Sequence, residues 1–169
     1  MEYSHFIDLL THNAERIKAM ATGISSEQAR WKPDPNSWSI LEVINHLYDE
    51  EREDFRVRLD VILHHPEQEF PAIDPEGWVI ARRYNERELE SSLESFMKER
   101  RASLEWLQSL GRVDWDRVHR SDFGSINAGD MFTSWGTHDQ LHLRQLIELH
   151  RGYTELQAKP YRIEYAGSW

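Results

Sequence analysis

The stretch "NAGDMFTSWGTHDQLHLRQLIELHRG", residues 127–152, repeats its apolar residues at the spacing of an α-helix. Asn127 is a suitable N-cap, so we predict a helix from this residue to position 151 or 152. Each helical residue advances by about 100°, which places several side chains on one narrow stripe. That stripe consists of Met131, Trp135, His138, His142, Gln145 and Leu149. Its apolar members predict that both histidines face the protein interior.

Three amphipathic segments precede this helix, over about residues 2–20, 39 to 64 or 65, and 85–111. Ser39 and Glu42 have the spacing of a capping box at the start of the second segment. We expect a similar pattern to start the third segment near position 85. Gly111 is a residue type that commonly ends a helix. With the last helix, these segments predict an all-α four-helix bundle.

The predicted helices are joined by long connections rather than by tight turns. "PEQEFPAIDPEGW" (66–78) holds three prolines and a glycine in thirteen residues and is predicted to be a loop. "RVDWDRVHRSDFGSI" (112–126) is predicted to be an extended or hairpin-like connector. We expect a single domain over residues 1–169, with a core at about 4–152 and a tail at 153–169. The aromatic end "KPYRIEYAGSW" is predicted to pack across the bundle surface or an edge.

The composition excludes several classes of function. The formal net charge of −10 argues against nucleic-acid binding, which depends on clustered Lys and Arg. The dense basic run "KERR" (98–101) is flanked by glutamates and is interpreted as a solvated helix face. The absence of cysteine excludes disulfides, thiolate metal sites and a catalytic thiol. No stretch approaches the roughly 20 apolar residues of a membrane span, so we predict a cytoplasmic protein with no membrane contact.

The inward histidines have the spacing of metal ligands. His138 and His142 lie one helical turn apart, so their ring nitrogens can converge on one ion. His46 lies on the buried border of the second segment, and facing helices of a bundle commonly combine such ligands. Three imidazoles with an open position suit zinc, nickel or a similar divalent ion. Such a site acidifies a bound water, polarises a carbonyl or stabilises a thiolate.

Neighbouring acidic residues extend this hypothesis. Glu50 follows His46 by one turn and is a candidate for a further ligand or a water-activating base. Asp49 or Asp139 is a candidate for orienting a metal-ligating side chain without binding the metal itself.

Histidine pairs at this spacing also occur by chance. The alternative is that these histidines are core residues that hydrogen-bond to the backbone. His5 and His12 share a helix face and form the one rival pair. The remaining histidines are interpreted as surface or helix-end residues: His64, His65, His119 and His150.

Two stretches together resemble the DinB-like (DinB/YfiT) superfamily of metal-dependent enzymes. They are "WKPDPNSWSILEVINHLYDEE" (31–51) and "FGSINAGDMFTSWGTHDQLHLRQL" (123–146), and the similarity extends over about residues 4–152. The resemblance implies a DinB-like four-helix bundle in which His46, His138 and His142 bind a divalent metal ion, most often nickel or zinc. It also implies a homodimer.

Characterised members of that superfamily include thiol transferases that use bacillithiol, mycothiol or glutathione. The resemblance therefore implies a thiol S-transferase acting on a small molecule, with Arg144 as a candidate to hold the carboxylates of the thiol. Metal-dependent hydrolysis, with Glu50 transferring a proton, is an alternative that needs the same ligands. A third alternative is a non-catalytic, stress-related binding or dimerisation module whose metal is structural.

Overall fold

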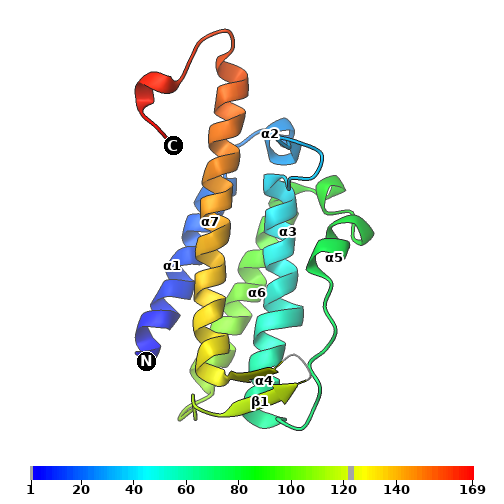
Figure 1. Ribbon diagram of the computed structural model, residues 1–169, viewed down its shortest axis with the longest axis vertical. Helices are drawn as coiled ribbons and strands as arrows, with labels where there is room; N and C mark the ends of the chain where they lie inside the picture. Colours follow the sequence, from blue (N-terminus) through cyan, green and yellow to red (C-terminus); the bar gives the residue numbers. More distant parts are fainter. Residues whose placement is uncertain (1, 122–123) are drawn as a thin grey trace.

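The computed structural model describes residues 2–121 and 124–169, and within them long helical segments run side by side (Figure 1). The long segments are α1 (Tyr3–Ala21), α3 (Ile40–Glu50) with its continuations η1 (Glu51–Phe55) and α4 (Arg56–His64), α6 (Leu89–Ser109) and α7 (Ala128–Ala158). The short elements are α2 (Ser26–Arg30), α5 (Pro75–Ala81), η2 (Tyr84–Glu86), β1 (Val118–Ser121), β2 (Gly124–Asn127) and η3 (Glu164–Ala166).

The long segments form a four-helix bundle, as predicted from the sequence. α1 packs against both α7 and α6, while α3 packs against α6 and also contacts α7. The antiparallel β1–β2 hairpin closes one end of the bundle, beside the start of α7 (Figure 1). This hairpin lies in the connector at 112–126, where the sequence predicted one; Phe123 of that connector lies outside the described residues. None of the helices formed by the described residues combines the length and the apolar character needed to span a bilayer.

The second long helix starts as the sequence predicts. The backbone N–H of Ser39 donates to the Glu42 carboxylate, and the backbone N–H of Glu42 donates to Ser39 Oγ. The helix then continues through η1, a π-helical turn, into α4 without a break. Single π-turns inside α-helices occur frequently at functional sites. Here the turn begins directly after Glu50.

Two predictions about where helices begin are wrong. The 66–78 segment is not all loop, because Asp74 accepts a hydrogen bond from the Gly77 N–H and begins α5, with Pro75 in the first turn. The third long helix begins at Leu89 rather than near position 85, because Tyr84–Glu86 form a separate 3₁₀ turn.

The last helix is longer than predicted, and Gly152 lies within it. A Cβ atom at this position would lie 3.0 Å from the Trp31 ring, so this glycine permits close packing rather than ending the helix. The tail, predicted to pack on the bundle surface or an edge, is largely exposed: Tyr161, Tyr165 and Trp169 are 82%, 105% and 71% exposed. Its contact with the bundle includes the Trp169 ring, whose centroid lies 5.4 Å from Arg151 Cζ on α7.

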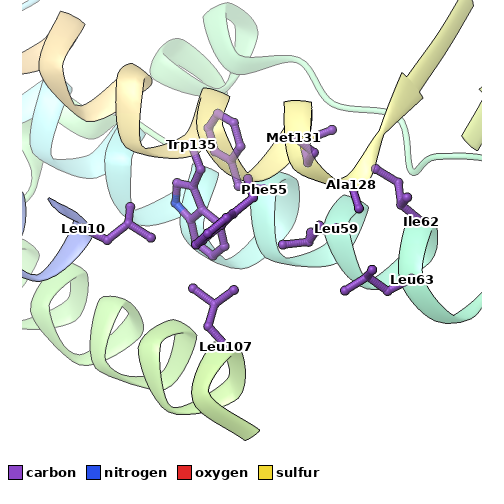
Figure 2. Close-up of a cluster of buried hydrophobic side chains, with 10 residues drawn as sticks. Leu10, Phe55, Leu59, Ile62, Leu63, Leu107, Ala128, Met131 and Trp135 are labelled. Carbon is purple, nitrogen blue, oxygen red and sulfur yellow. The ribbon is translucent and has the colours of Figure 1, made fainter. Parts of the chain in front are cut away.

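The interior consists of two apolar clusters along the bundle. Figure 2 shows the cluster nearer the hairpin, in which the rings of Phe55 and Trp135 are stacked at 5.8 Å between centroids. Leu10 and Leu107 pack in the same cluster from α1 and α6. The other cluster joins α1, α3, α6 and α7, and Trp38 packs at its border. The three histidines lie where the two clusters meet, since His138 contacts Phe55 and His46 contacts Trp38.

The basic run at 98–101 is not entirely solvated, because the Arg100 side chain is fully buried. Its guanidinium donates to Glu51 Oε1 at 2.8 Å, to both carboxylate oxygens of Asp139 at 2.8 Å, and to the carbonyl of Leu10 at 2.9 Å. Arg100 follows the buried Phe96 by one helical turn, so it belongs to the inward stripe of α6. It therefore links α6 to α1, η1 and α7.

Candidate metal centre

Two helices bring the three histidines together. α3 carries His46, which is 4% exposed, and the capping box of Ser39 sets where that helix begins. α7 carries His138 and His142, which are half-buried and one turn apart. The inward stripe predicted for α7 is confirmed by the burial of its apolar members on either side, including Trp135 and Leu149.

The ring nitrogens of these histidines converge. His138 Nε2 lies 3.4 Å from His46 Nε2 and 3.1 Å from His142 Nε2. Ligand nitrogens of a tetrahedral zinc ion, each 2.0–2.1 Å from the metal, lie roughly 3.3 Å apart. These two distances match that spacing, and ligand atoms of all three histidines lie within 4.8 Å of one another, so together the side chains can hold one divalent ion. In the part of the chain that the structure describes, no second set of three such side chains converges in this way, so His5 and His12 gain no support.

The imidazoles are held in the neutral form that binds metals. Burial, together with the neighbouring histidines, lowers the pKa of His46 to about 2. Burial also lowers the pKa of His138 to about 3, aided by the charge of His142 and of Arg100. The pKa of His142 is lowered by burial as well, while its hydrogen bond to Gln145 acts in the opposite direction.

Gln145 fixes the orientation of His142. Its Oε1 atom lies 2.8 Å from His142 Nδ1. An amide oxygen only accepts, so Nδ1 carries the proton and the Nε2 lone pair points to the other histidines. Gln145 belongs to the stripe identified in the sequence, but its role was not predicted. Its position three residues after His142, on the same helix face, is the signal that could have revealed it.

Glu50 lies behind His46 rather than among the converging nitrogens. Its Oε1 atom is 3.8 Å from His46 Nδ1, and neither atom has a hydrogen-bond partner among the described residues. Burial raises the pKa of the Glu50 carboxyl to about 9, and the nearby Asp54 adds to this effect. Asp54 itself pairs with Arg58, with 2.6 Å between Oδ1 and Nε. In the metal-free protein these surroundings favour the protonated form of the Glu50 carboxyl.

The other predicted polar partners lie away from the histidines. Asp49 pairs with Arg52 and Arg82, and Asp139 pairs with Arg100, so their carboxylates are engaged elsewhere. The Arg144 side chain is 72% exposed, and its Nε lies 3.4 Å from Glu148 Oε1. The structure does not bring Arg144 into the histidine cluster.

A cavity opens to the cluster on each of two sides. The Trp38 cavity, of about 390 Å³, is lined by Trp38, His142, Gln145 and Glu148 among others. Within it, the Trp38 ring is parallel to the His142 ring, with 6.3 Å between centroids.

The Phe55 cavity, of about 340 Å³, is lined by Phe55, Thr133, Ser134, Thr137, His138 and Leu141. Each cavity therefore contains one of the two α7 histidines. A small molecule can approach the cluster from either side.

Two histidines were misjudged from the sequence. His150 was interpreted as a surface or helix-end residue, but it is half-buried within α7, and its Nε2 atom lies 2.7 Å from the carbonyl oxygen of Met20. His119 was interpreted as a surface or helix-end residue, but it is 2% exposed. Its ring stacks on Phe70, with 4.0 Å between centroids. A position on a short hairpin strand gives no helical periodicity from which this burial could be inferred.

Comparisons with known proteins agree with this architecture. A family model described as the DinB superfamily matches residues 9–146. Among solved structures, YfiT from Bacillus subtilis, described as a probable metal-dependent hydrolase with an unusual four-helix bundle topology, superposes with a TM-score of 0.78. The two chains are 16% identical, and the match covers 89% of this chain and 86% of YfiT. No curated protein matches this chain.

Proposed function

The chain belongs to the DinB superfamily, and we propose that it is a metal-dependent hydrolase of a small organic molecule. In this proposal His46, His138 and His142 bind the metal ion. The observation that carries the proposal is the convergence of the three Nε2 atoms, 3.1 and 3.4 Å apart, beside cavities that admit a substrate. The description of YfiT agrees with it, although 16% identity supports the fold alone.

Three protein ligands favour a catalytic over a structural metal. Structural zinc sites are normally closed by four protein ligands, whereas catalytic sites keep a position open. Among the described residues, the converging group contains three side chains. A zinc or nickel ion held there supplies a Lewis acid that lowers the pKa of a bound water or thiol and polarises a substrate carbonyl.

The chain's own residues supply orientation and a proton. Gln145 holds the His142 ring by accepting a hydrogen bond from His142 Nδ1, and Trp38 lines the cavity with its ring parallel to that of His142. We propose that the Glu50 carboxyl, which lies beside His46 Nδ1, holds a proton. The raised pKa of this carboxyl in the metal-free protein is the reason for assigning it a held proton rather than the role of base suggested by the sequence.

Thiol S-transfer is the second candidate, and the sequence resemblance favours it. It would use the same three histidines, with a low-molecular-weight thiol at the open position. The two reactions differ in whether a thiol must be added. The homodimer, the cytoplasmic location and the non-catalytic module remain predictions from the sequence.

The test starts with metal analysis of untagged protein purified without chelators. We expect about one zinc or nickel ion per chain, lost in the His138→Ala/His142→Ala variant and retained in His64→Ala. His64 is a suitable control because it is half exposed and pairs with Asp60. The metal-loaded protein would then be assayed on esters, amides and lactones, with and without thiols.

Hydrolysis without thiol that is lost in the double variant supports the proposal. Turnover only with an added thiol would establish transfer instead. A wild-type protein that neither contains nor takes up metal would overturn both reactions.

A further inference from the structure

The charges around the cluster restrict what can bind there. Among the described residues that line the Trp38 and Phe55 cavities, none is a lysine or an arginine. One ionised side chain, the carboxylate of Glu148, lines the Trp38 cavity. An anionic group of a substrate that is not bound to the metal ion therefore meets one carboxylate, and no lysine or arginine, among the described lining residues.

Four arginines that contact the segment following His46 are already paired with carboxylates. Their partners lie on α3, η1 and α7: Arg52 and Arg82 pair with Asp49 and Glu53, Arg58 with Asp54, and Arg100 with Glu51 and Asp139. To bind a substrate anion, one of these guanidinium groups would have to leave a partly or fully buried carboxylate, which is costly.

Arg144 lies on α7 between His142 and Gln145, and it lines neither cavity. Its Nε is 3.4 Å from Glu148, so the pair offers no net positive charge to an incoming anion. At longer range, the formal charge of −10 on the chain repels anions as well.

The uncharged groups of the two cavities suit neutral or cationic ligands. Ser37, Asn36 and Gln145 offer hydrogen bonds in the Trp38 cavity, and Phe55 with Leu141 offers apolar contact in the other. The aromatic face of Trp38, which lines the first of these cavities, is a favourable environment for an ammonium group.

We propose that this site binds uncharged or cationic organic substrates and discriminates against anionic ones, including thiols that carry carboxylates. The inference rests on the proposed function, because it names the substrate class of the same metal centre. It follows from the lining of the cavities and from the pairing of the neighbouring arginines.

The test uses zinc-loaded protein and three hydroxamates of equal length, ending in a methyl, a trimethylammonium or a carboxylate group. Hydroxamates chelate divalent ions, so each would place its end group in a cavity. Binding would be measured by calorimetry, with the His138→Ala/His142→Ala variant as the metal-free reference. We expect the carboxylate compound to bind at least about fivefold more weakly than the neutral one.

Two variants identify the group responsible. Glu148→Gln is expected to reduce the difference between the cationic and anionic compounds. Glu155→Gln is the matched control, since Glu155 pairs with Arg151 on the same helix at the same 3.4 Å and lines neither cavity. It should leave the difference unchanged.

The outcomes separate the two hypotheses. Equal or tighter binding of the carboxylate compound would overturn the inference and leave the proposed function intact. If Arg144→Gln selectively weakens binding of the carboxylate compound, Arg144 is the anion site. This result would also overturn the inference and leave the proposed function intact. If none of the three compounds binds the zinc-loaded wild-type protein more tightly than it binds the double variant, the proposed function fails, and the inference fails with it.

Discussion

Gln145 Oε1 accepts a hydrogen bond from His142 Nδ1 at 2.8 Å. The bond connects residues three positions apart on α7, so both the ring and the amide are fixed by one rigid helix. It leaves Nε2 of His142 as the atom directed at His138. The same helix therefore supplies two of the proposed ligands and the group that sets the tautomer of one of them.

Gln145→Leu is expected to weaken zinc binding by about 10- to 100-fold, because partners of this kind fix the tautomer and orientation of a ligating histidine. Competition titration against a chromogenic chelator measures the change. Gln145→Glu keeps an acceptor oxygen at the same place and should restore most of the affinity. Unchanged affinity in the leucine variant would show that the bond does not orient His142.

The metal-free protein should be most stable near pH 6.5. His46 and His138 have folded pKa values of about 2 and about 3, below the ordinary 6.5. The unfolded chain therefore binds more protons than the folded protein below pH 6.5. Each of the two histidines lowers the free energy of unfolding by about 1.4 kcal/mol for each pH unit of acidification. Glu50, with a folded pKa of about 9 against 4.5, has the opposite effect and lowers stability as the pH rises from 4.5 to 9. Between pH 4.5 and 6.5 the two histidines outweigh the one carboxyl.

Urea unfolding at a series of pH values, in the presence of a chelator, measures this profile. Glu50→Gln should remove the loss of stability on the alkaline side and keep the loss on the acidic side. A wild-type profile that rises steadily from pH 6.5 to 9 would contradict the assignment of a protonated Glu50.

Arg100→Met should lower the free energy of unfolding by about 3–5 kcal/mol, because it leaves Glu51 and Asp139 as unpaired buried charges. Replacing all three together, with Glu51→Gln and Asp139→Asn, should recover part of the loss. Chemical denaturation of both variants tests this. Arg83→Met, a change at an exposed arginine, is the control. If Arg100→Met lowers the free energy of unfolding no more than Arg83→Met does, the network is not stabilising.

Ser39→Ala should cost about 0.5–2 kcal/mol, since it removes the acceptor for the Glu42 N–H in the capping box. Ser39 Oγ also donates to Asn85 Oδ1 at 2.7 Å, which ties the start of α3 to the segment after α5. Ser91→Ala, at an exposed position of α6, is the matched control. Similar losses in both variants would contradict a specific role for the cap.

The sequence predicted those parts of the fold and of the candidate site that follow a helical period. His138 and His142 could be placed inward because Met131, Trp135 and Leu149 share their stripe. The prediction of His46 needed only the matching period of a second helix. These positions depend on local geometry, which a single sequence contains.

Features that depend on partners distant in the chain could not be predicted. Arg100 looks solvated in the run of charges at 98–101, and its burial depends on Glu51 and Asp139, 49 and 39 residues away. Arg144 was a candidate for anion binding because of its place on α7, whereas its exposure and its pairing with Glu148 depend on which side of the bundle is covered. The same limit applies to His119, whose neighbour Phe70 comes from another connector.

The π-helical turn at Glu51–Phe55 has a consequence for how relatives of this chain are compared. A wide turn holds one more residue than an α-turn, so it absorbs that residue without changing the rotation of α4 relative to α3. If the same residues formed a regular α-helix instead, α4 would be rotated by about 100°. Leu59 and Ile62, both fully buried, would then turn away from the interior. A relative without the wide turn should therefore lack one residue at this place, and its sequence will match this chain on both sides only across a gap of a single position. Loss of that residue together with the wide turn would keep His46 and the buried residues of α4 in place.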